Sequence, residues 1–268
     1  MSVVTAPTSE PLDLARAKDH LRVTDSESDS LIASLIASAR AYAEFDTQRV
    51  LVVQTRDLTL DAFPSAGVPI DLWLGVPLVS VLSVKYVDTD GNTQTLATSV
   101  YTVDAASTPG RVFLAFDQSW PDTRAERNAV TIQYVAGYVT PFSVAVAANT
   151  LTQSGRSVAN GDVVRLSNSG GQLPAPLVPL TDYYVVGLAA PTFQLSLTSG
   201  GAAIDIADTG DGTHFLGVLP EDLEIGMLLL VGGMFENREE VAEGRVAPLP
   251  EVISARRLFA HHRVARFV

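Results

Sequence analysis

Histidine and carboxylate side chains are the groups of this chain that could hold a metal ion or transfer protons, because its 268 residues include no cysteine. The absence of cysteine excludes disulfides, zinc–thiolate centres, iron–sulfur clusters and a cysteine nucleophile. The histidines include one adjacent pair, His261 and His262. On a helix these two rings would point about 100° apart, whereas two metal ligands on one helix face need a spacing of three or four residues. The sequence therefore predicts no metal site.

Two acidic segments that contain glycine resemble the start of a calcium-binding loop. In Asp88–Asn92 the glycine comes two positions too early and no bidentate glutamate follows at the required distance, so we expect a hairpin turn. Asp208–Gly212 invites the same comparison and the same interpretation. Asp104, Asp117 and Asp122 could meet in space as a hydrolytic carboxylate site, but most acidic residues are solvated surface groups.

Sequence motifs for catalysis are missing. The chain has no Gly-x-Ser-x-Gly nucleophile elbow and no Walker loop. The pair Gly210 and Gly212 is followed by no helix that would present backbone N–H groups to a phosphate, so it is not a dinucleotide-binding loop. We therefore predict a protein that is not an enzyme and that uses no cofactor.

The largest charge asymmetry lies at the C-terminal end of the chain. From Val252 onward there are basic and aromatic residues and no acidic residue. One interpretation is a helix whose last turn carries cations that suit its dipole, and the other is a segment that docks on an acidic partner. Because the whole chain has a net charge of −12, we expect that partner to be a protein, including a neighbouring copy of this chain. The candidate docking residues are Arg256, Arg257, Phe259, Arg263 and Phe267.

The composition of the chain excludes several further classes of protein. With 47% hydrophobic and 18% charged residues the chain is not a disordered segment, and its length fits one large domain or two small ones. The negative net charge argues against tight wrapping on nucleic acid, which needs several lysine or arginine contacts with phosphates. The longest apolar run, Ile225–Met234, is too short to span a membrane, and the N-terminal residues lack the apolar core of a secretion signal. We expect no membrane partner.

Four segments have the hydrophobic periodicity of helices. A capping box of Thr24 and Glu27 is expected to start the second of them. Acidic residues after Pro220 complement the dipole of the third. The expected helices are residues 12–23, 25–48, 220–239 and 250–262. The expected core-facing residues of the second helix are Leu31, Ile32, Leu35, Ile36, Ala39, Tyr42 and Ala43.

The rest of the chain has the pattern of short strands. Residues 50–139 alternate in the way that predicts a small antiparallel sheet joined by turns. From Thr140 to Gly217 there is no lysine, glycine is dense and strand candidates recur roughly every ten residues, which indicates an all-β sandwich or barrel. The strand candidates are 55–60, 70–74, 79–87, 101–103, 111–116, 130–135, 150–153, 163–166, 183–186, 193–197, 204–206 and 213–216.

Several of these segments resemble the head–tail connector (adaptor) proteins of long-tailed bacteriophages and gene transfer agents. The resemblance rests on Leu-Asp-Leu-Ala-Arg-Ala-Lys-Asp-His-Leu-Arg-Val at 12–23, Tyr-Val-Ala-Gly-Tyr at 134–138 and a segment at 219–239 that ends in Glu-Asn-Arg-Glu. The closing Arg257-Leu-Phe and Arg263-Val are similar to the end of that family, although His261-His262-Arg263 replaces a frequent Pro-Tyr-Arg. Residues 140–218 separately resemble a β module of phage structural proteins, with Val158-Ala-Asn-Gly-Asp-Val-Val-Arg-Leu among its marks.

The resemblance implies an α+β fold. Its helical adaptor core, with about four helices and a small antiparallel β-sheet, would be discontinuous over 1–139 and 219–268, and an all-β sandwich or barrel domain would be inserted at 140–218. It also implies a structural virion protein that forms a ring of twelve copies under the portal protein. That ring would join the DNA-filled head to a stopper or tail-completion protein in the neck of the particle. Double-stranded DNA would pass through its lumen without specific binding, and before assembly the protein would be in the host cytoplasm. The C-terminal docking residues would then meet the portal or a neighbouring copy.

An alternative places the function in the 140–218 segment, as a receptor- or carbohydrate-binding module. Tyr183, Tyr184 and Phe193 could offer a stacking surface to a sugar. Alternating aromatic residues in strands are more often core residues, however, which favours the structural interpretation.

Overall fold

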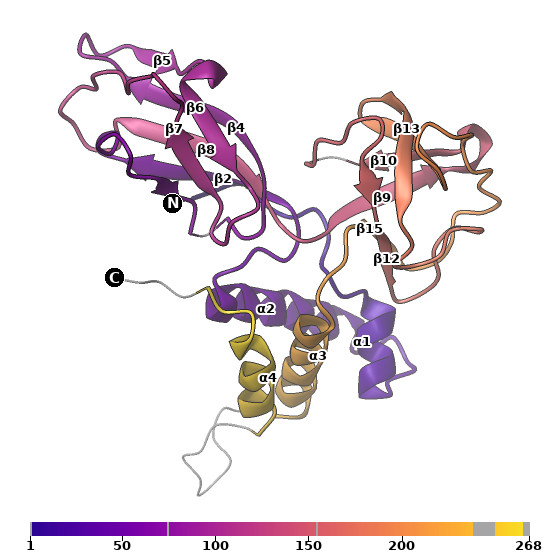
Figure 1. Ribbon diagram of the computed structural model, residues 1–268. Coiled ribbons are helices and arrows are strands. Elements are labelled where there is room, and N and C mark those ends of the chain that lie inside the picture. The colour runs from indigo at the N-terminus through magenta and orange to yellow at the C-terminus, as the bar shows by residue number, and fades with distance from the viewer. Residues whose placement is uncertain (1, 74, 154, 238–249, 265–268) are drawn as a thin grey trace, which may run out of the picture. The chain divides into compact units, whose positions relative to one another are not determined.

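The computed structural model describes residues 2–73, 75–153, 155–237 and 250–264 and divides the chain into two compact units (Figure 1). The first contains residues 2–7 and 48–137 with Val264, and the second contains residues 8–47 and 138–263. Within the described residues, no helix combines the length and the apolar character that a membrane crossing requires. The predicted α+β class is confirmed, with four helices and several antiparallel sheets among the described residues.

The first unit consists of two antiparallel sheets. Its five-stranded sheet has the order β1-β2-β8-β4-β5 and its three-stranded sheet the order β3-β7-β6. The strands of the larger sheet are β1 (Ser2–Thr5), β2 (Gln54–Leu60), β8 (Val130–Ala136), β4 (Leu78–Val87) and β5 (Thr93–Thr95). Those of the smaller sheet are β3 (Ile70–Asp71), β7 (Arg111–Leu114) and β6 (Tyr101–Asp104).

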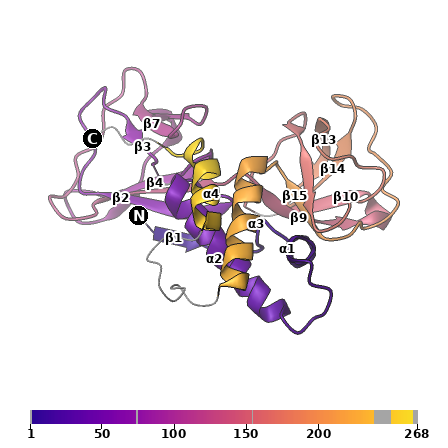
Figure 2. The ribbon, with the colours of Figure 1, turned by 90° about the horizontal axis from the view of Figure 1, so that it is seen from below.

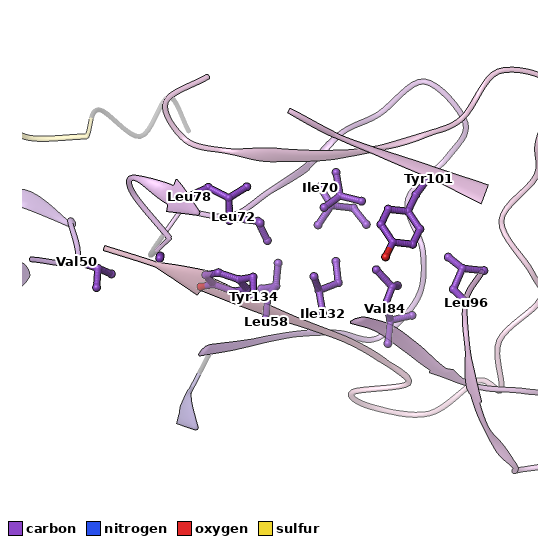
Figure 3. Packing of buried hydrophobic residues seen from close by; sticks show 13 residues of the cluster. Val50, Leu58, Ile70, Leu72, Leu78, Val84, Leu96, Tyr101, Ile132 and Tyr134 are labelled. Atoms are coloured by element: carbon purple, nitrogen blue, oxygen red, sulfur yellow. The ribbon is translucent and has the colours of Figure 1, made fainter. Parts of the chain in front are cut away.

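The core of the first unit lies between these sheets. Figure 3 shows Leu58 and Ile132 of the larger sheet on one side and Ile70 of the smaller sheet on the other. Tyr134 of β8 is fully buried in this core, and its ring lies so close to Gly75 that a Cβ atom there would collide with it. Apolar side chains on alternate positions of β2 and β8 therefore point inward, as their period of two predicts.

The phenol of Tyr134 predicts a specific pH dependence of stability. Burial raises its pKa to about 12, with Arg56 acting in the opposite direction, and its hydroxyl has no hydrogen-bond partner among the described residues. An unfolded tyrosine ionises near pH 10, so between about pH 10 and 12 the unfolded state loses this proton first and the free energy of unfolding falls as pH rises. We expect Tyr134→Phe to remove about 1.3 kcal/mol of that fall between about pH 9 and 11. Urea unfolding of both proteins at the two pH values measures it, and equal falls would contradict it.

Four α-helices among the described residues belong to the second unit. They are α1 (Leu14–Leu21), α2 (Asp29–Thr47), α3 (Glu221–Glu236) and α4 (Pro250–Ala260). Helix α3 packs against both α2 and α4, and the three lie side by side in Figure 2. Asp13 caps α1 by accepting a hydrogen bond from the N–H of Ala15, and Arg22 ends it in the left-handed conformation.

The start of α2 differs from the prediction. The Thr24–Glu27 capping box is wrong, because the carboxylate of Asp25 accepts the N–H of Glu27 and residues 25–28 form a turn, so that the helix begins at Asp29. Leu31, expected in the core, is 38% exposed. The buried stripe follows Ile32, Ile36, Ala39 and Ala43, as a helical period requires.

The β strands of the second unit form one seven-stranded antiparallel sheet, β11-β13-β14-β10-β9-β15-β12. Its edge strands β11 (Val163–Val164) and β12 (Leu166–Ser169) are separated only by Arg165, so the sheet closes almost into a barrel. The other strands are β9 (Thr140–Ala145), β10 (Thr150–Gln153), β13 (Tyr183–Ala189), β14 (Thr192–Ser196) and β15 (Thr213–Leu216). The expected strand at 204–206 does not form, although Ile206 is buried and the N–H of Ile204 donates to Leu195.

Two of the three aromatic residues considered for carbohydrate stacking, Tyr183 and Phe193, face the interior of this barrel. Tyr183 and Phe193 belong to the buried cluster, with 2% and 0% of their surface exposed, and the Tyr183 hydroxyl accepts a hydrogen bond from the N–H of Val178. Their assignment as core residues is therefore confirmed. These two rings offer no stacking surface to a carbohydrate, whereas Tyr184, which alternates with Tyr183 along β13, is half-buried.

Two hydrogen bonds tie the barrel to the start of α1 within the second unit. The backbone N–H of Asp13 donates to Ser169 Oγ at 2.8 Å, and Thr213 Oγ1 donates to the Asp13 carboxylate at 2.7 Å. Gly170 leaves room for this carboxylate, since a Cβ there would lie 2.6 Å from it. The capping residue of the first helix thus also anchors the β12–β15 pair.

Candidate docking surface

The C-terminal helix α4 carries the residues expected to dock. It begins at Pro250, which suits the first position of a helix because no N–H is needed there. Ala255 and Phe259, four residues apart, are fully buried on one side, whereas Arg256 and Arg257 are exposed. One face of α4 therefore belongs to the core of the helices, and the guanidinium groups lie outside it.

The ring of Phe259 is held by the neighbouring helices. It lies directly against Gly226 of α3, and its centroid is 6.5 Å from that of Tyr42 in α2. A glycine at position 226 removes the side chain that would otherwise occupy this space. The aromatic side chain thus fastens α4 to α2 and α3 rather than offering an anchor to a partner.

One carboxylate, that of Asp46 at the end of α2, lies close to two of the basic residues. Arg263 donates to both of its oxygens, with Nη2 at 2.7 Å and 2.8 Å and Nε at 3.1 Å. Arg256 Nε lies 3.7 Å away, and only 9% of the Asp46 side chain is exposed. A carboxylate is unfavourable at a helix C-terminus, so these cations offset both the dipole and the partial burial.

The histidine pair occupies two different environments. His261 is exposed, whereas His262 Nε2 lies 3.6 Å from the carboxylate of Asp222 in the first turn of α3. Within the described residues, no cluster of three or more histidine or acidic side chains could hold a metal ion.

The structure separates the predicted docking residues into three groups. Arg256 and Arg257 are exposed on α4, where Arg256 Nε also lies 3.7 Å from Asp46. Phe259 is buried in the helical core, and Arg263 is bound to Asp46. Phe267 lies outside the described residues. The exposed part of the candidate surface thus consists of the outer side of α4. Arg257 lies there opposite the buried side, and Arg256, about 100° around the helix from it, lies beside Asp46.

Two residues of this site were missed by sequence reasoning. Asp46 has a recognisable signal, because an acidic residue in the last turn of a helix opposes the dipole and calls for a nearby cation. Gly226 interrupts an otherwise apolar helix, which signals a close approach by another side chain. Neither signal identifies the distant residue that makes the contact.

Loss of the Asp46 charge should loosen the segment that follows α4. We expect Asp46→Asn to lower the free energy of unfolding by about 1 kcal/mol, since the two arginines are largely solvated and the pair is screened. Hydrogen exchange at the N–H of His262 and Arg263 should become faster. The matched control is Asp222→Asn, whose half-exposed carboxylate lies 3.6 Å from His262 Nε2 and should change exchange little. Equal exchange in Asp46→Asn and the unaltered protein would contradict the prediction.

Two of the acidic residues considered for catalysis or calcium, Asp104 and Asp88, have structural roles. Asp104 accepts hydrogen bonds from Ala106 and Ser107, and the bond from the Ser107 hydroxyl lowers its pKa. Asp88 accepts from the N–H groups of Asp90 and Asn92 in the turn between β4 and β5. The hairpin predicted at Asp88 is therefore confirmed, and both carboxylates stabilise turns.

Known proteins are similar to this chain in sequence over one segment and in fold over its full length. Residues 11–69 match the family described as phage gp6-like head-tail connector protein. Among curated proteins no match is found.

Three solved chains have a similar fold. A chain from the virion of a native gene transfer agent particle has a TM-score of 0.57 and 18% identity, over 100% of this chain and 96% of that one. Chains from the neck of an empty particle, computed with C6 symmetry, and from the neck of a native particle, computed with C12 symmetry, have TM-scores of 0.54 and 0.51. Each is 17% identical over 100% of this chain and 98% of its own.

These matches confirm the resemblance to head–tail connectors of phages and gene transfer agents. The family match covers α1, α2 and β2, and the fold likeness extends over the β strands of residues 140–216 as well.

Proposed function

We propose that this chain is the head-to-tail adaptor of a phage-like particle. Twelve copies form a ring under the portal protein, join the DNA-filled head to a stopper or tail-completion protein, and enclose the DNA conduit. The protein works in the neck of the virion and assembles there from the host cytoplasm. One observation carries the proposal: a chain with a connector sequence at 11–69 has, over its full length, the fold of chains from gene transfer agent necks.

The proposed organisation is an adaptor core of residues 1–139 and 219–268 with a β domain inserted at 140–218. The ends of the inserted segment support it, because β9 and β15 pair with each other, Thr140 opposite Leu216. A segment whose two ends meet adds little loop-closure entropy to the domain that carries it.

The charge of the chain suits a conduit for DNA. With 30 acidic against 18 basic residues, repeated copies repel a polyanion rather than bind it. A ring with such a lumen would let double-stranded DNA slide through without specific contacts.

Contact with the portal is assigned to the outer face of α4. Arg256 and Arg257 are exposed there, about 100° apart around the helix, and each offers a guanidinium group to an acidic protein partner. Arg263, which holds Asp46, positions the end of this helix. Phe259 supports it from within the core.

Co-sedimentation with purified portal tests this assignment, and negative-stain microscopy of the mixture tests the ring. We expect twelve-fold rings on the portal, and loss of binding in Arg257→Glu, which leaves the contact of Arg256 with Asp46 in place. The matched control reverses one exposed arginine of the first unit, Arg127→Glu, and should bind as the unaltered chain does. Undiminished binding of the α4 variant would overturn the docking assignment, and absence of rings on the portal would overturn the adaptor role.

A further inference from the structure

One aromatic ring of the first unit is almost completely exposed. Phe116, just after β7, has 98% of its surface in contact with solvent. It stands at the tip of a turn in which the N–H of Gln118 donates to Ala115 at 3.2 Å and Asp117 has a φ of 57°. The turn is fixed to the unit, because the N–H of Ala115 donates to Val100 at 2.9 Å. The backbone thus holds this ring away from the core.

Exposure of a single apolar residue is common, but an aromatic ring as completely exposed as that of Phe116 is unusual. Phenylalanine contributes a large apolar surface, and most such rings in folded proteins are buried at least in part. No described residue forms a ring contact with it. An aromatic ring that a hydrogen-bonded turn holds in solvent, away from the other described residues, gains the free energy of burial only in an assembly.

The same unit has an apolar pocket that is open to solvent. Its volume is 360 Å³, and its lining includes Leu58 and Leu60 of β2, Ile70 of β3 and Trp73. Figure 3 shows Leu58 and Ile70 on opposite sides of the core. The pocket is open because β3 is an edge strand of its sheet, so no further strand covers this side. A cavity of about 150 Å³ already admits a benzene ring, so this pocket has room for a phenylalanine side chain.

The ring and the pocket are displaced from each other along the unit. Ile70 of the pocket pairs with Val112 of β7, and Phe116 lies four residues beyond Val112, roughly 13 Å along an extended chain. Its turn therefore holds it at the other end of β7 from the pocket. Two different surfaces that complement each other, repeated on every copy, produce a head-to-tail contact, which closes into a ring when the rotation between copies allows it.

We propose that Phe116 of one copy inserts into the pocket beside Leu60 of the next copy. The occupant is thus a second copy of this chain, and the contact is one of those that hold the ring together. This inference rests on the proposed ring and adds the surfaces by which its copies meet.

The lack of cysteine in the chain makes a direct test possible. Full-length Gln118→Cys and Ala62→Cys proteins keep Phe116 and Leu60 and carry one cysteine beside the ring and one at the pocket. They are mixed at millimolar concentration and treated with a short bis-maleimide. We expect covalent dimers in the mixture but not from either protein alone, and a ladder of oligomers from a chain that carries both substitutions. The matched control pairs Ala62→Cys with Val103→Cys, a 40% exposed position of the same unit, and should give no product. Dimers from Gln118→Cys alone would indicate a symmetric contact between the two rings and overturn the proposal.

Phe116→Ser adds a readout that does not depend on cross-linking. Because the ring is 98% exposed in the single chain, the thermal midpoint should stay unchanged while self-association weakens by about tenfold or more. If Phe116→Ser forms rings on the portal that are as stable as those of the unaltered chain, and the cysteine pair gives no cross-linked product, the contact is overturned and the adaptor role stands. Cross-linked product without rings would support the contact and overturn the ring. Absence of both would overturn both.

Discussion

Gly137→Ala is expected to destabilise the first unit by about 3 kcal/mol or more, a large part of the stability of a small domain. Gly137 has a φ of 146°, a conformation that alanine adopts only with strain. A Cβ at this position would also lie 2.6 Å from both the Cα and the N atom of Val53. These are backbone atoms, which cannot rotate away. The N–H of Gly137 donates to Pro77 at 3.0 Å, so the segment is held on both sides.

Thermal unfolding followed by circular dichroism measures this effect, and a loss of this size should lower the Tm of the unit by more than about 10 °C. Gly67→Ala is the matched control. Gly67 also has a positive φ, 86°, but no atom lies within 4 Å of where its Cβ would be. The control therefore includes the conformational strain without the collision, and we expect about 1 kcal/mol from it. Equal shifts for the two variants would show that the contact with Val53 does not matter.

The same glycine explains part of a motif that the sequence resemblance used. Tyr134-Val-Ala-Gly-Tyr contains two residues with separate structural requirements: the ring of Tyr134 fills the core, and Gly137 lets the backbone of Val52 and Val53 pass over it. The glycine and tyrosine types were visible in the sequence. The reason for the glycine was not, because Val53 is far away in the chain and only the folded sheet brings the two together.

Helices were more predictable than strands because their signals are local. The acidic first turn and apolar stripe of α3, and the proline that starts α4, each lie within one segment and placed both helices within a few residues of their observed ends. Strand β1 (Ser2–Thr5) has no such signal, since its four residues are exposed and become a strand only by pairing with β2. The start of α2 was misplaced because Asp25 competes with Thr24 for the same N–H groups.

In the candidate site too, features set within one segment were predictable and contacts between distant segments were not. The exposed positions of Arg256 and Arg257 agree with a charged helix face, which the spacing of residues predicts. The inward direction of Phe259 depends on a vacancy at Gly226 in another helix, and the orientation of Arg263 depends on Asp46 in a third. Such pairings between distant residues are properties of the packed helices rather than of any one segment.

The second large effect on stability is expected where Phe259 packs against Gly226. Phe259→Ala removes a fully buried ring and should lower the free energy of unfolding by about 3–5 kcal/mol. Gly226→Ala should also destabilise, by about 1–3 kcal/mol, because its Cβ would lie 2.9 Å from Cζ and 3.0 Å from Cδ1 of that ring. The matched control is Gly232→Ala in the same helix. Its Cβ would meet only the ring of His20 at 3.5 Å, so its better helix propensity should stabilise the protein by up to about 1 kcal/mol.

The double variant Gly226→Ala with Phe259→Ala decides whether these two residues act on each other. Once the ring is absent, the new methyl group has room and fills part of the cavity, so the combined loss should be smaller than the sum of the two single losses by about 1 kcal/mol or more. Denaturant unfolding of the four proteins measures this coupling. Strictly additive losses would show that Gly226 is not there to admit Phe259. In that case the face that α4 presents to a partner would depend on other contacts, and the outward position of Arg256 and Arg257 would lose its structural explanation.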